Sequence, residues 1–115
     1  MPKEYDLEER TEKFTKDVIR LCKKLPKNTI NFELIEQVVS ASGSVGANYI
    51  EANEALSKKD FFHRIKICRK ESKEARYWLR LIVFSNSEFE KETKPLIQEA
   101  TELMNIFGAI LRKGT

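Results

Sequence analysis

The feature that most constrains the fold is a repeat of apolar residues, spaced alternately three and four positions apart, in four long stretches. These stretches span about residues 6–25, 32–56, 58–85 and 93–113. The spacing places apolar side chains on one face of an α-helix, and it suits helices that pack at shallow angles. Because only short connections separate the stretches, we expect an all-α, antiparallel up-down-up-down four-helix bundle.

Length and composition agree with one soluble domain, residues 1–115, which can bury a single core. The four Gly and three Pro are too few for the turns of an all-β fold. No apolar run approaches the roughly 20 residues that cross a bilayer, and the charged N-terminal stretch is unlike a signal peptide. Cys22 and Cys68 lie in apolar-periodic stretches, so we expect buried free thiols in a reducing cytosol. The sequence therefore predicts a cytoplasmic protein with no membrane partner.

Local signals mark several helix ends. Asn31 is a candidate N-cap for the second helix, and Ser57 is the expected N-cap of the third. The fourth helix begins either after Ser87 or after Thr93. We place its start at Thr93, because Pro95 then fits the first turn of the helix.

The second helix contains a segment of small residues, 40–47, which includes Gly43 and Gly46. Each interior glycine costs roughly 1 kcal/mol relative to Ala. The segment is either a break at Gly43 or part of an unbroken helix whose small face lets another backbone approach. A phosphate-cradling loop is a third alternative, but no strand precedes it and no Gly-Lys-Ser/Thr sequence ends it. We favour the unbroken helix because its apolar seam keeps phase across the glycines. That seam consists of Ile35, Val39, Ser42, Gly46, Tyr49, Asn53 and Leu56, flanked by Val38, Val45 and Ala52.

The third helix carries most of the positive charge. Residues 58–80 contain nine Lys and Arg against Asp60, Glu71 and Glu74, although the whole chain has a net charge of only +3. At about 100° per residue, eight of these bases share one arc of the helix. We call this set the basic stripe: Lys58, Lys59, Lys66, Arg69, Lys70, Lys73, Arg76 and Arg80.

The basic stripe has two interpretations. Like charges on one arc repel, and a solvated helix face usually mixes both signs, so the stripe favours RNA or DNA phosphates as partner. Since no base-reading motif is evident, recognition would be of backbone or shape. Alternatively, water solvates the stripe, or acids of the first helix or of a neighbouring subunit neutralise it. The protein is then a structural or protein-interaction scaffold without a nucleic-acid role. The candidate acids are Glu8, Glu9, Glu12 and Asp17.

Other residues suggest contacts between subunits. Trp78 and Ile67 lie on a second apolar face of the third helix, beyond what one four-helix core buries, which predicts self-association. Asn48 and Glu51 lie one turn apart on the second helix. They form a candidate buried polar pair, expected to hydrogen-bond to the third helix or to another subunit.

No catalytic or metal-binding constellation is recognisable. His63 is the single histidine, and with Glu51 and Glu54 it lacks the Glu-x-x-His spacing of di-iron bundles. We find no Ser-His-Asp, Cys-His or paired-carboxylate arrangement. The sequence predicts a protein that is not an enzyme and that needs neither cofactor nor metal.

Three segments resemble a bacterial protein family: 44–52 (SVGANYIEA), 55–61 (ALSKKDF) and 70–79 (KESKEARYWL). The family is the small four-helix-bundle proteins named after the intervening sequences of large-subunit (23S) rRNA genes. Its pattern runs S-V-x-A-N-x-x-E-A, S-K-x-D-F, then E-x-x-Y-W-L. Residues 96–103 (LIQEATEL) resemble its final helix, so that the resemblance covers nearly the whole chain.

The resemblance implies an up-down bundle, commonly a ring-shaped homopentamer, with no known enzymatic activity. A related protein, the accessory variability determinant of diversity-generating retroelements, is a pentamer that binds nucleic acid and a reverse transcriptase. The resemblance thus implies copies of this chain, RNA or DNA, or another protein as partners. Family members often carry an Arg shortly before the S-V-x-A-N motif. Ser40-Ala41-Ser42 stands there instead, which argues against a basic contribution from the second helix.

Overall fold

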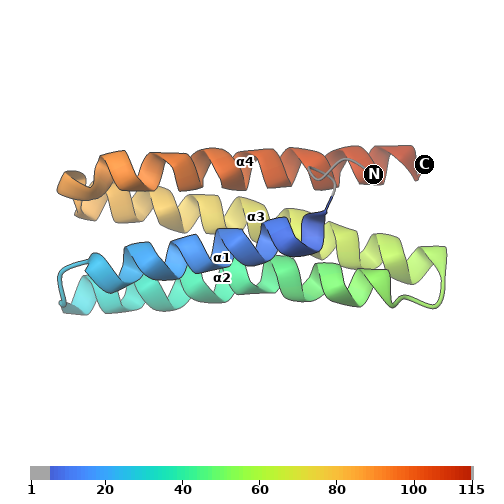
Figure 1. Ribbon diagram of the computed structural model, residues 1–115, viewed down its shortest axis with the longest axis horizontal. Coiled ribbons are helices and arrows are strands. Elements are labelled where there is room, and N and C mark those ends of the chain that lie inside the picture. Colours follow the sequence, from blue (N-terminus) through green and yellow to red (C-terminus); the bar gives the residue numbers. More distant parts are fainter. Residues whose placement is uncertain (1–5, 115) are drawn as a thin grey trace.

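The computed structural model describes residues 6–114 as four long α-helices and one short 3-10 helix (Figure 1). The elements are α1 (Leu7–Lys24), α2 (Thr29–Asn53), α3 (Lys58–Ser85), the 3-10 helix η2 (Ser87–Phe89) and α4 (Glu90–Lys113). Successive helices run in opposite directions. α1 packs on α2, α2 on α3, α3 on α4 and α4 on α1. This arrangement confirms the antiparallel four-helix bundle.

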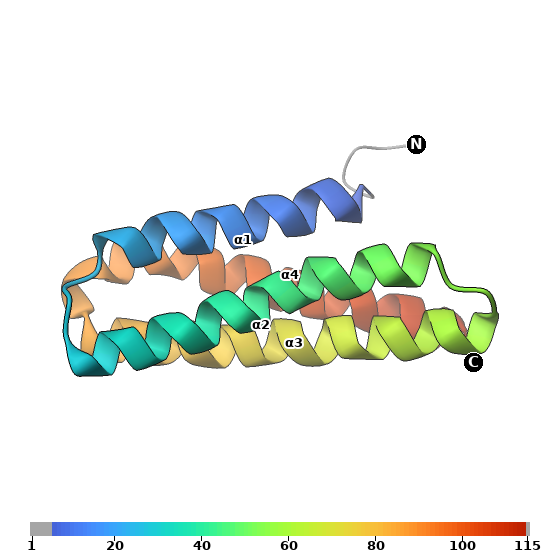
Figure 2. The ribbon, with the colours of Figure 1, turned by 90° about the horizontal axis from the view of Figure 1, so that it is seen from below.

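The connections lie alternately at the two ends of the bundle. Figure 2 shows the α1–α2 connection at one end and the α2–α3 connection at the other, with α3 running back alongside α2. The order of packing places α1 and α3 on opposite corners. Charges on α1 therefore do not face the outer side of α3.

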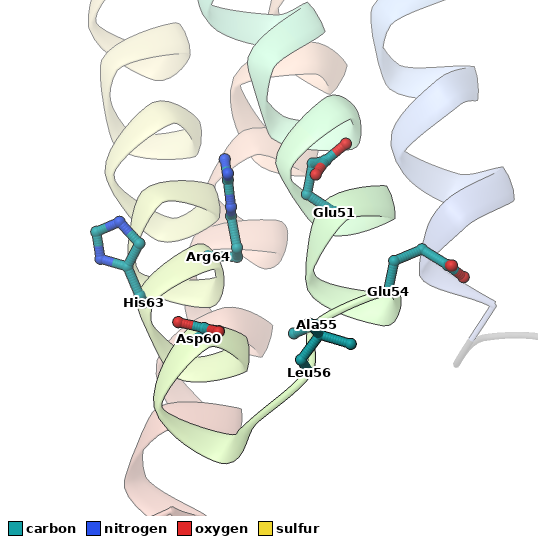
Figure 3. Close-up of a pocket in the computed structure, with 7 residues that line it drawn as sticks. All are labelled: Glu51, Glu54, Ala55, Leu56, Asp60, His63 and Arg64. Carbon is teal, nitrogen blue, oxygen red and sulfur yellow. The ribbon is translucent and has the colours of Figure 1, made fainter.

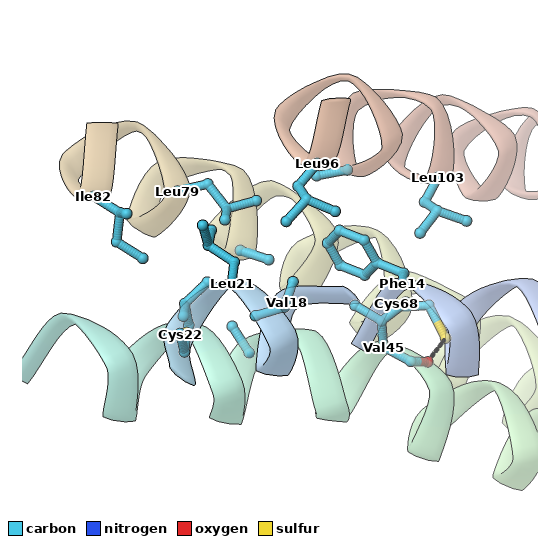
Figure 4. Close-up of a cluster of buried hydrophobic side chains, with 14 of the residues drawn as sticks. Phe14, Val18, Leu21, Cys22, Val45, Cys68, Leu79, Ile82, Leu96 and Leu103 are labelled. Atoms are coloured by element: carbon cyan, nitrogen blue, oxygen red, sulfur yellow. Dashed lines mark hydrogen bonds between the residues drawn. The ribbon is translucent and has the colours of Figure 1, made fainter. Parts of the chain in front are cut away.

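All four helices contribute side chains to one core (Figure 4). The apolar repeat of the first helical stretch is buried; it consists of Leu7, Phe14, Val18, Leu21, Cys22 and Leu25. The repeat of the third stretch is buried except for the half-buried Phe61; it consists of Phe61, Ile65, Cys68, Ser72, Ala75, Leu79 and Ile82. Cys68 of α3 donates its thiol hydrogen to the carbonyl of Val45 on α2, with Sγ and O 3.4 Å apart. Burial raises the pKa of Cys22 to about 11 and that of Cys68 to about 12, so both free thiols stay protonated near neutral pH.

The seam predicted for the second helix is wrong by about one position. The residues that α2 buries are Asn31, Leu34, Val38, Ala41, Ser42, Val45 and Ala52. Four members of the predicted seam, Ile35, Val39, Gly46 and Tyr49, are only half-buried, while Asn53 and Leu56 are exposed. Two neighbouring faces of this helix are apolar, and the positions of α1 and α3 decide which one faces the core.

α2 begins three residues earlier than predicted, and it ends at Asn53. The N-cap is Asn28, whose Oδ1 accepts a hydrogen bond from the backbone N–H of Asn31 at 2.8 Å. Asn28 and Asn31 are equally good capping residues by type. Asn31 instead lies in the first turn with its side chain buried.

α4 begins at Glu90, three residues before the predicted start, because the η2 turn leads directly into the helix. Thr93 is buried inside the first turn, where its hydroxyl donates to the carbonyl of Phe89 at 2.7 Å. The predicted cap of α3 is confirmed, since the Ser57 hydroxyl accepts from the Asp60 N–H at 3.1 Å.

The small-residue segment does not break α2, as we favoured. A Cβ at Gly46 would lie 3.0 Å from Thr11 Oγ1, so α1 approaches α2 closely at this point. A Cβ at Gly43 would have nothing within 4 Å. The close approach expected at both glycines is thus made within the chain only at Gly46, and Gly43 faces open space.

Candidate nucleic-acid interface

The basic stripe lies on the outer side of α3. Seven of its eight residues are exposed, and Arg76 is half-buried. The buried seam of α3, which includes Ile65, Cys68 and Leu79, holds a different side of the helix against the core. Because helical side chains keep fixed angles to one another, burial of this seam presents the stripe to solvent along the helix.

Few acids of the described residues neutralise the stripe. Lys70 is its one member with an ion pair in that part of the chain, at 3.8 Å from its sequence neighbour Glu71. The acids expected to neutralise the stripe from α1 include two with other partners: Asp17 pairs with Lys13 and Arg20 at 2.7 Å, and Glu12 pairs with Lys16. Neutralisation by α1 of the same chain is therefore not found among residues 6–114.

The stripe continues into a groove between α3 and α4 with a volume of about 220 Å³. α3 contributes Arg69 and Lys73, and α4 contributes Met104, Asn105, Gly108 and Arg112. Among the described residues that line it are three bases and an amide, and none of these described residues is an acid. The sequence analysis did not connect the α4 residues with the stripe. Asn105, Gly108 and Arg112 are three and four positions apart, and this spacing places them on the same side of a helix.

The second apolar face of α3, which carries Ile67 and Trp78, is partly covered, since both residues are half-buried. Trp78 is half-buried at the edge of the core, and its indole N–H donates to Glu74 at 3.4 Å. The pKa of Glu71 is raised, first by burial and then by the charge of Glu74, with Lys70 acting in the opposite direction. Tyr77, within the basic arc, is 54% exposed and meets the Trp78 ring edge-on at 5.0 Å between centroids.

The sequence matches the family model described as 23S rRNA-intervening sequence protein over residues 3–109. The chain belongs to this family. A 1.70 Å crystal structure of a protein with unknown function, from the S23 ribosomal protein family of Bacteroides thetaiotaomicron, has the same fold. Its TM-score is 0.82 at 26% identity, and the match covers 90% of this chain and 96% of that chain. No curated protein matches.

In this member of the family, the motif residues Asn48 and Glu51 do not form a buried pair. Asn48 is half-buried, and its Oδ1 accepts a hydrogen bond from Arg64 of α3 at 2.9 Å, while its Nδ2 donates to the carbonyl of Ser44. Glu51 is exposed. The expected hydrogen bond to α3 is therefore made by Asn48, and it holds Arg64, the one base of residues 58–80 outside the stripe.

Glu51 instead lies at a cavity of about 330 Å³ beside the α2–α3 connection (Figure 3). In Figure 3 the carboxylates of Glu51 and Glu54 come from the α2 side, whereas Asp60, His63 and Arg64 project from α3. Across residues 6–114, no group of three or more His, Cys, Asp or Glu side chains is placed to hold a metal ion. The described residues that line the cavity carry charges of both signs, three carboxylates and one arginine, together with His63. They do not form a metal-coordination sphere.

None of the helices described combines the length and the apolar character needed to cross a membrane.

Proposed function

We propose that this family member is a non-enzymatic, homo-oligomeric helical bundle that binds RNA or DNA phosphates through the basic stripe of α3 in the cytoplasm. The observation that carries the proposal is the unpaired state of the stripe. Within residues 6–114, seven of its eight members have no ion pair. A row of fixed cations attracts a polyanion, and binding gains free energy by releasing counterions from the phosphates.

Exposed apolar side chains support self-association. Phe84, at the end of α3, is 88% exposed, and Phe32, near the start of α2, is 58% exposed. The end of α3 and the start of α2 lie at the same end of the bundle (Figure 1). Large apolar side chains left exposed to solvent are typical of subunit interfaces. Five copies, the number that the family resemblance implies, predict a particle of five times 13.4 kDa in light scattering.

Charge reversal tests the nucleic-acid role. We expect Arg69→Glu, Lys73→Glu and Arg76→Glu together to abolish binding of a labelled single-stranded RNA or DNA without unfolding the bundle. Wild-type affinity should fall steeply as salt rises, because each phosphate contact releases counterions. Fluorescence anisotropy measures the affinity, and circular dichroism reports the helix content. Unchanged affinity in the triple variant would overturn the proposal.

A matched control has the same change in charge away from the stripe. Lys23, Lys27 and Lys91 are exposed and have no ion pair within residues 6–114. Their replacement by Glu should weaken binding far less than the stripe variant does, since only long-range attraction is reduced. Equal losses in the two triple variants would show that net charge alone governs binding, and would contradict a role for the stripe.

A second candidate is a scaffold in which the stripe meets acids of a neighbouring subunit. Glu8 and Glu9 of α1 favour it, because both are exposed and have no ion pair in the described part of the chain. Light scattering during a salt titration separates the two functions. Dissociation of the oligomer at high salt indicates that the stripe acts between subunits, whereas a stable oligomer that loses RNA or DNA indicates phosphate binding.

A further inference from the structure

An exposed aromatic side chain lies inside the basic stripe. Three aromatic side chains are exposed in the described part of the chain: Phe32, Tyr77 and Phe84. Phe32 belongs to α2, and Phe84 follows the last base of the stripe. Tyr77 comes four positions after Lys73 and three positions before Arg80, so these three side chains lie on the same side of α3. The ring of Tyr77 is therefore flanked by a cation on either side along the helix.

Contacts within the chain do not account for the aromatic character of Tyr77. The hydrophobic core includes its neighbour Trp78 but not Tyr77, whose hydroxyl has no hydrogen-bond partner among residues 6–114. The two rings meet edge-on, with 71° between their planes, so Trp78 covers at most one face of the Tyr77 ring. Most of the remaining ring surface is open to a ligand, because the residue is 54% exposed.

Another aromatic residue on the stripe's side of α3, Phe62, is packed within the chain. It is half-buried and meets Phe61 edge-on, with 5.2 Å between the ring centroids. A Cβ at Gly114 would overlap the Phe62 ring, so the end of α4 lies against it. Packing explains Phe62, whereas Tyr77 presents its ring to solvent between two bases.

Trp78 restricts where the Tyr77 ring lies. The indole is half-buried at the edge of the core, and its N–H donates to Glu74 at 3.4 Å. This bond also directs a carboxylate oxygen of Glu74, three positions before Tyr77, toward Trp78. A ring already held by its neighbour loses less conformational freedom when a ligand packs on it, which favours binding.

An aromatic ring among cations suits a single strand of nucleic acid. The cations attract the phosphates, and the ring stacks on a base, whose π face is present whatever its identity. In a duplex the bases are stacked on one another and present only their edges in the grooves. Stacking of this kind needs no base-reading motif, and none is evident in the sequence.

We propose that Tyr77 is a stacking site for one base of single-stranded RNA or DNA whose phosphates lie along the basic stripe. Lys73 and Arg80 attract the phosphates on either side of that base, and Trp78 keeps the ring in place. The site makes the stripe favour single strands over duplexes. The proposal rests on the proposed function, because phosphate binding along the stripe brings the strand to the ring.

Two substitutions separate the ring of Tyr77 from its hydroxyl. The probes are a labelled oligothymidylate and a labelled oligouridylate. For each strand that wild type binds, we expect Tyr77→Leu, which removes the π face, to weaken binding about fivefold or more. Tyr77→Phe keeps the ring and should bind like wild type. Equal losses in the two variants would assign the effect to the hydroxyl and overturn the stacking site. Leu56→Ala, at a residue that is 98% exposed outside the stripe, is the control and should bind like wild type.

An abasic strand with the same number of phosphates tests the contact with a base. Wild type should bind it about fivefold or more weakly than oligothymidylate, while Tyr77→Leu should bind the two strands with similar affinity. The salt slope should be the same for wild type and Tyr77→Leu, because stacking releases no counterions. If Tyr77→Leu lowers affinity for the abasic strand equally, or lowers the salt slope by about one, the lost contact is with a phosphate and the stacking site is overturned.

A duplex and the particle size test the two other roles of an exposed ring. Tyr77→Leu should leave the affinity for a duplex of equal length unchanged, and an equal loss for duplex and single strand would overturn the stacking site. Light scattering should give the same particle size for Tyr77→Leu and wild type. A smaller particle for the variant would place Tyr77 in a subunit contact and would also overturn the stacking site.

The outcomes distinguish failure of this site from failure of the proposed function. If the triple stripe variant loses binding while Tyr77→Leu binds like wild type, the stacking site is overturned and the proposed function stands. If wild type binds neither RNA nor DNA, the proposed function fails, and the stacking site fails with it.

Discussion

Asn31 and Asn86, 55 positions apart in the sequence, donate a side-chain hydrogen bond to each other in the buried interior. Each Nδ2 lies 2.9 Å from the Oδ1 of its partner. The second amide hydrogens go to the carbonyls of Pro26 and Ile82. The pair therefore ties the α1–α2 connection and the start of α2 to the end of α3.

Removing one amide of this pair should destabilise the bundle. We expect Asn31→Ala or Asn86→Ala to lower the free energy of unfolding by about 1–3 kcal/mol, because the remaining buried amide loses its partner. The variant Asn31→Leu/Asn86→Leu should cost less than the sum of the two single Leu variants, since it leaves no orphaned amide. Urea denaturation at fixed protein concentration measures the free energies of unfolding for this double-mutant cycle. Additive losses would show that the two amides do not depend on each other.

The two glycines of α2 should respond oppositely to alanine. Gly43→Ala should stabilise the helix by up to about 1 kcal/mol, because open space surrounds its Cβ. Gly46→Ala should destabilise, because its Cβ would lie 3.0 Å from Thr11 Oγ1. Thermal melts of the two variants make a matched comparison.

Thr11→Ala should rescue part of the loss in Gly46→Ala, since it removes the crowded hydroxyl. Destabilisation by Gly43→Ala together with a smaller particle in light scattering would instead place Gly43 in a subunit contact.

The bidentate ion pair between Arg10 and Glu99 should be weakened when lysine replaces Arg10. Arg10 Nε and Nη2 lie 2.7 and 2.8 Å from the two Glu99 oxygens, and this bonding raises the pKa of Arg10. Lysine cannot form two parallel hydrogen bonds, so Arg10→Lys should cost about 1 kcal/mol. Chemical denaturation measures the loss. An unchanged midpoint would mean that the charge at position 10 is sufficient and the bidentate geometry adds nothing. Lys13→Arg, at an exposed pair, serves as the control.

The buried thiols should make stability fall in alkali. The ordinary thiol pKa is 9.0, whereas burial raises that of Cys22 to about 11 and that of Cys68 to about 12. Above pH 9 the unfolded chain loses thiol protons that the folded chain keeps, so the free energy of unfolding falls as pH rises toward 11. At pH 10 the loss should be on the order of 1 kcal/mol per thiol.

The control for the thiols is the variant Cys22→Ala/Cys68→Ser. It retains the tyrosines and lysines that also titrate in this range, so its smaller loss between pH 8 and 10 isolates the thiols. The same slope in both proteins would show that the thiols do not titrate in unfolding. A disulfide-exchange reagent should react with the wild type only after denaturation.

Patterns local to one helix were sufficient to predict the buried faces of α1 and α3 from the sequence. The apolar repeat of α3 predicted its buried face and its full length, Lys58–Ser85, because Ser57 is a favourable N-cap residue and the repeat has one consistent phase. The seam of α1 was equally clear. The exposed arc of α3 followed from the same geometry, since at 100° per residue the stripe is centred about a third of a turn from the apolar seam.

Other features depended on where distant residues lie. α2 has two adjacent apolar faces, and both Asn28 and Asn31 are suited to the cap by type. The expected cap, Asn31, is wrong, because local sequence does not distinguish the two residues. Burial of Asn31 against Asn86 makes that choice in the folded chain. The α3–α4 groove likewise required the antiparallel packing that brings Gly108 and Asn105 beside Arg69.

The sequence by itself determined that four amphipathic helices form a bundle and that one helix carries the basic stripe. Periodicity within a helix is a local property, fixed by 3.6 residues per turn. The tertiary structure alone decided which face of α2 is buried, which cap begins it, and which α4 residues join Arg69 and Lys73. These depend on contacts between residues far apart in the chain, whose free energies no local pattern contains.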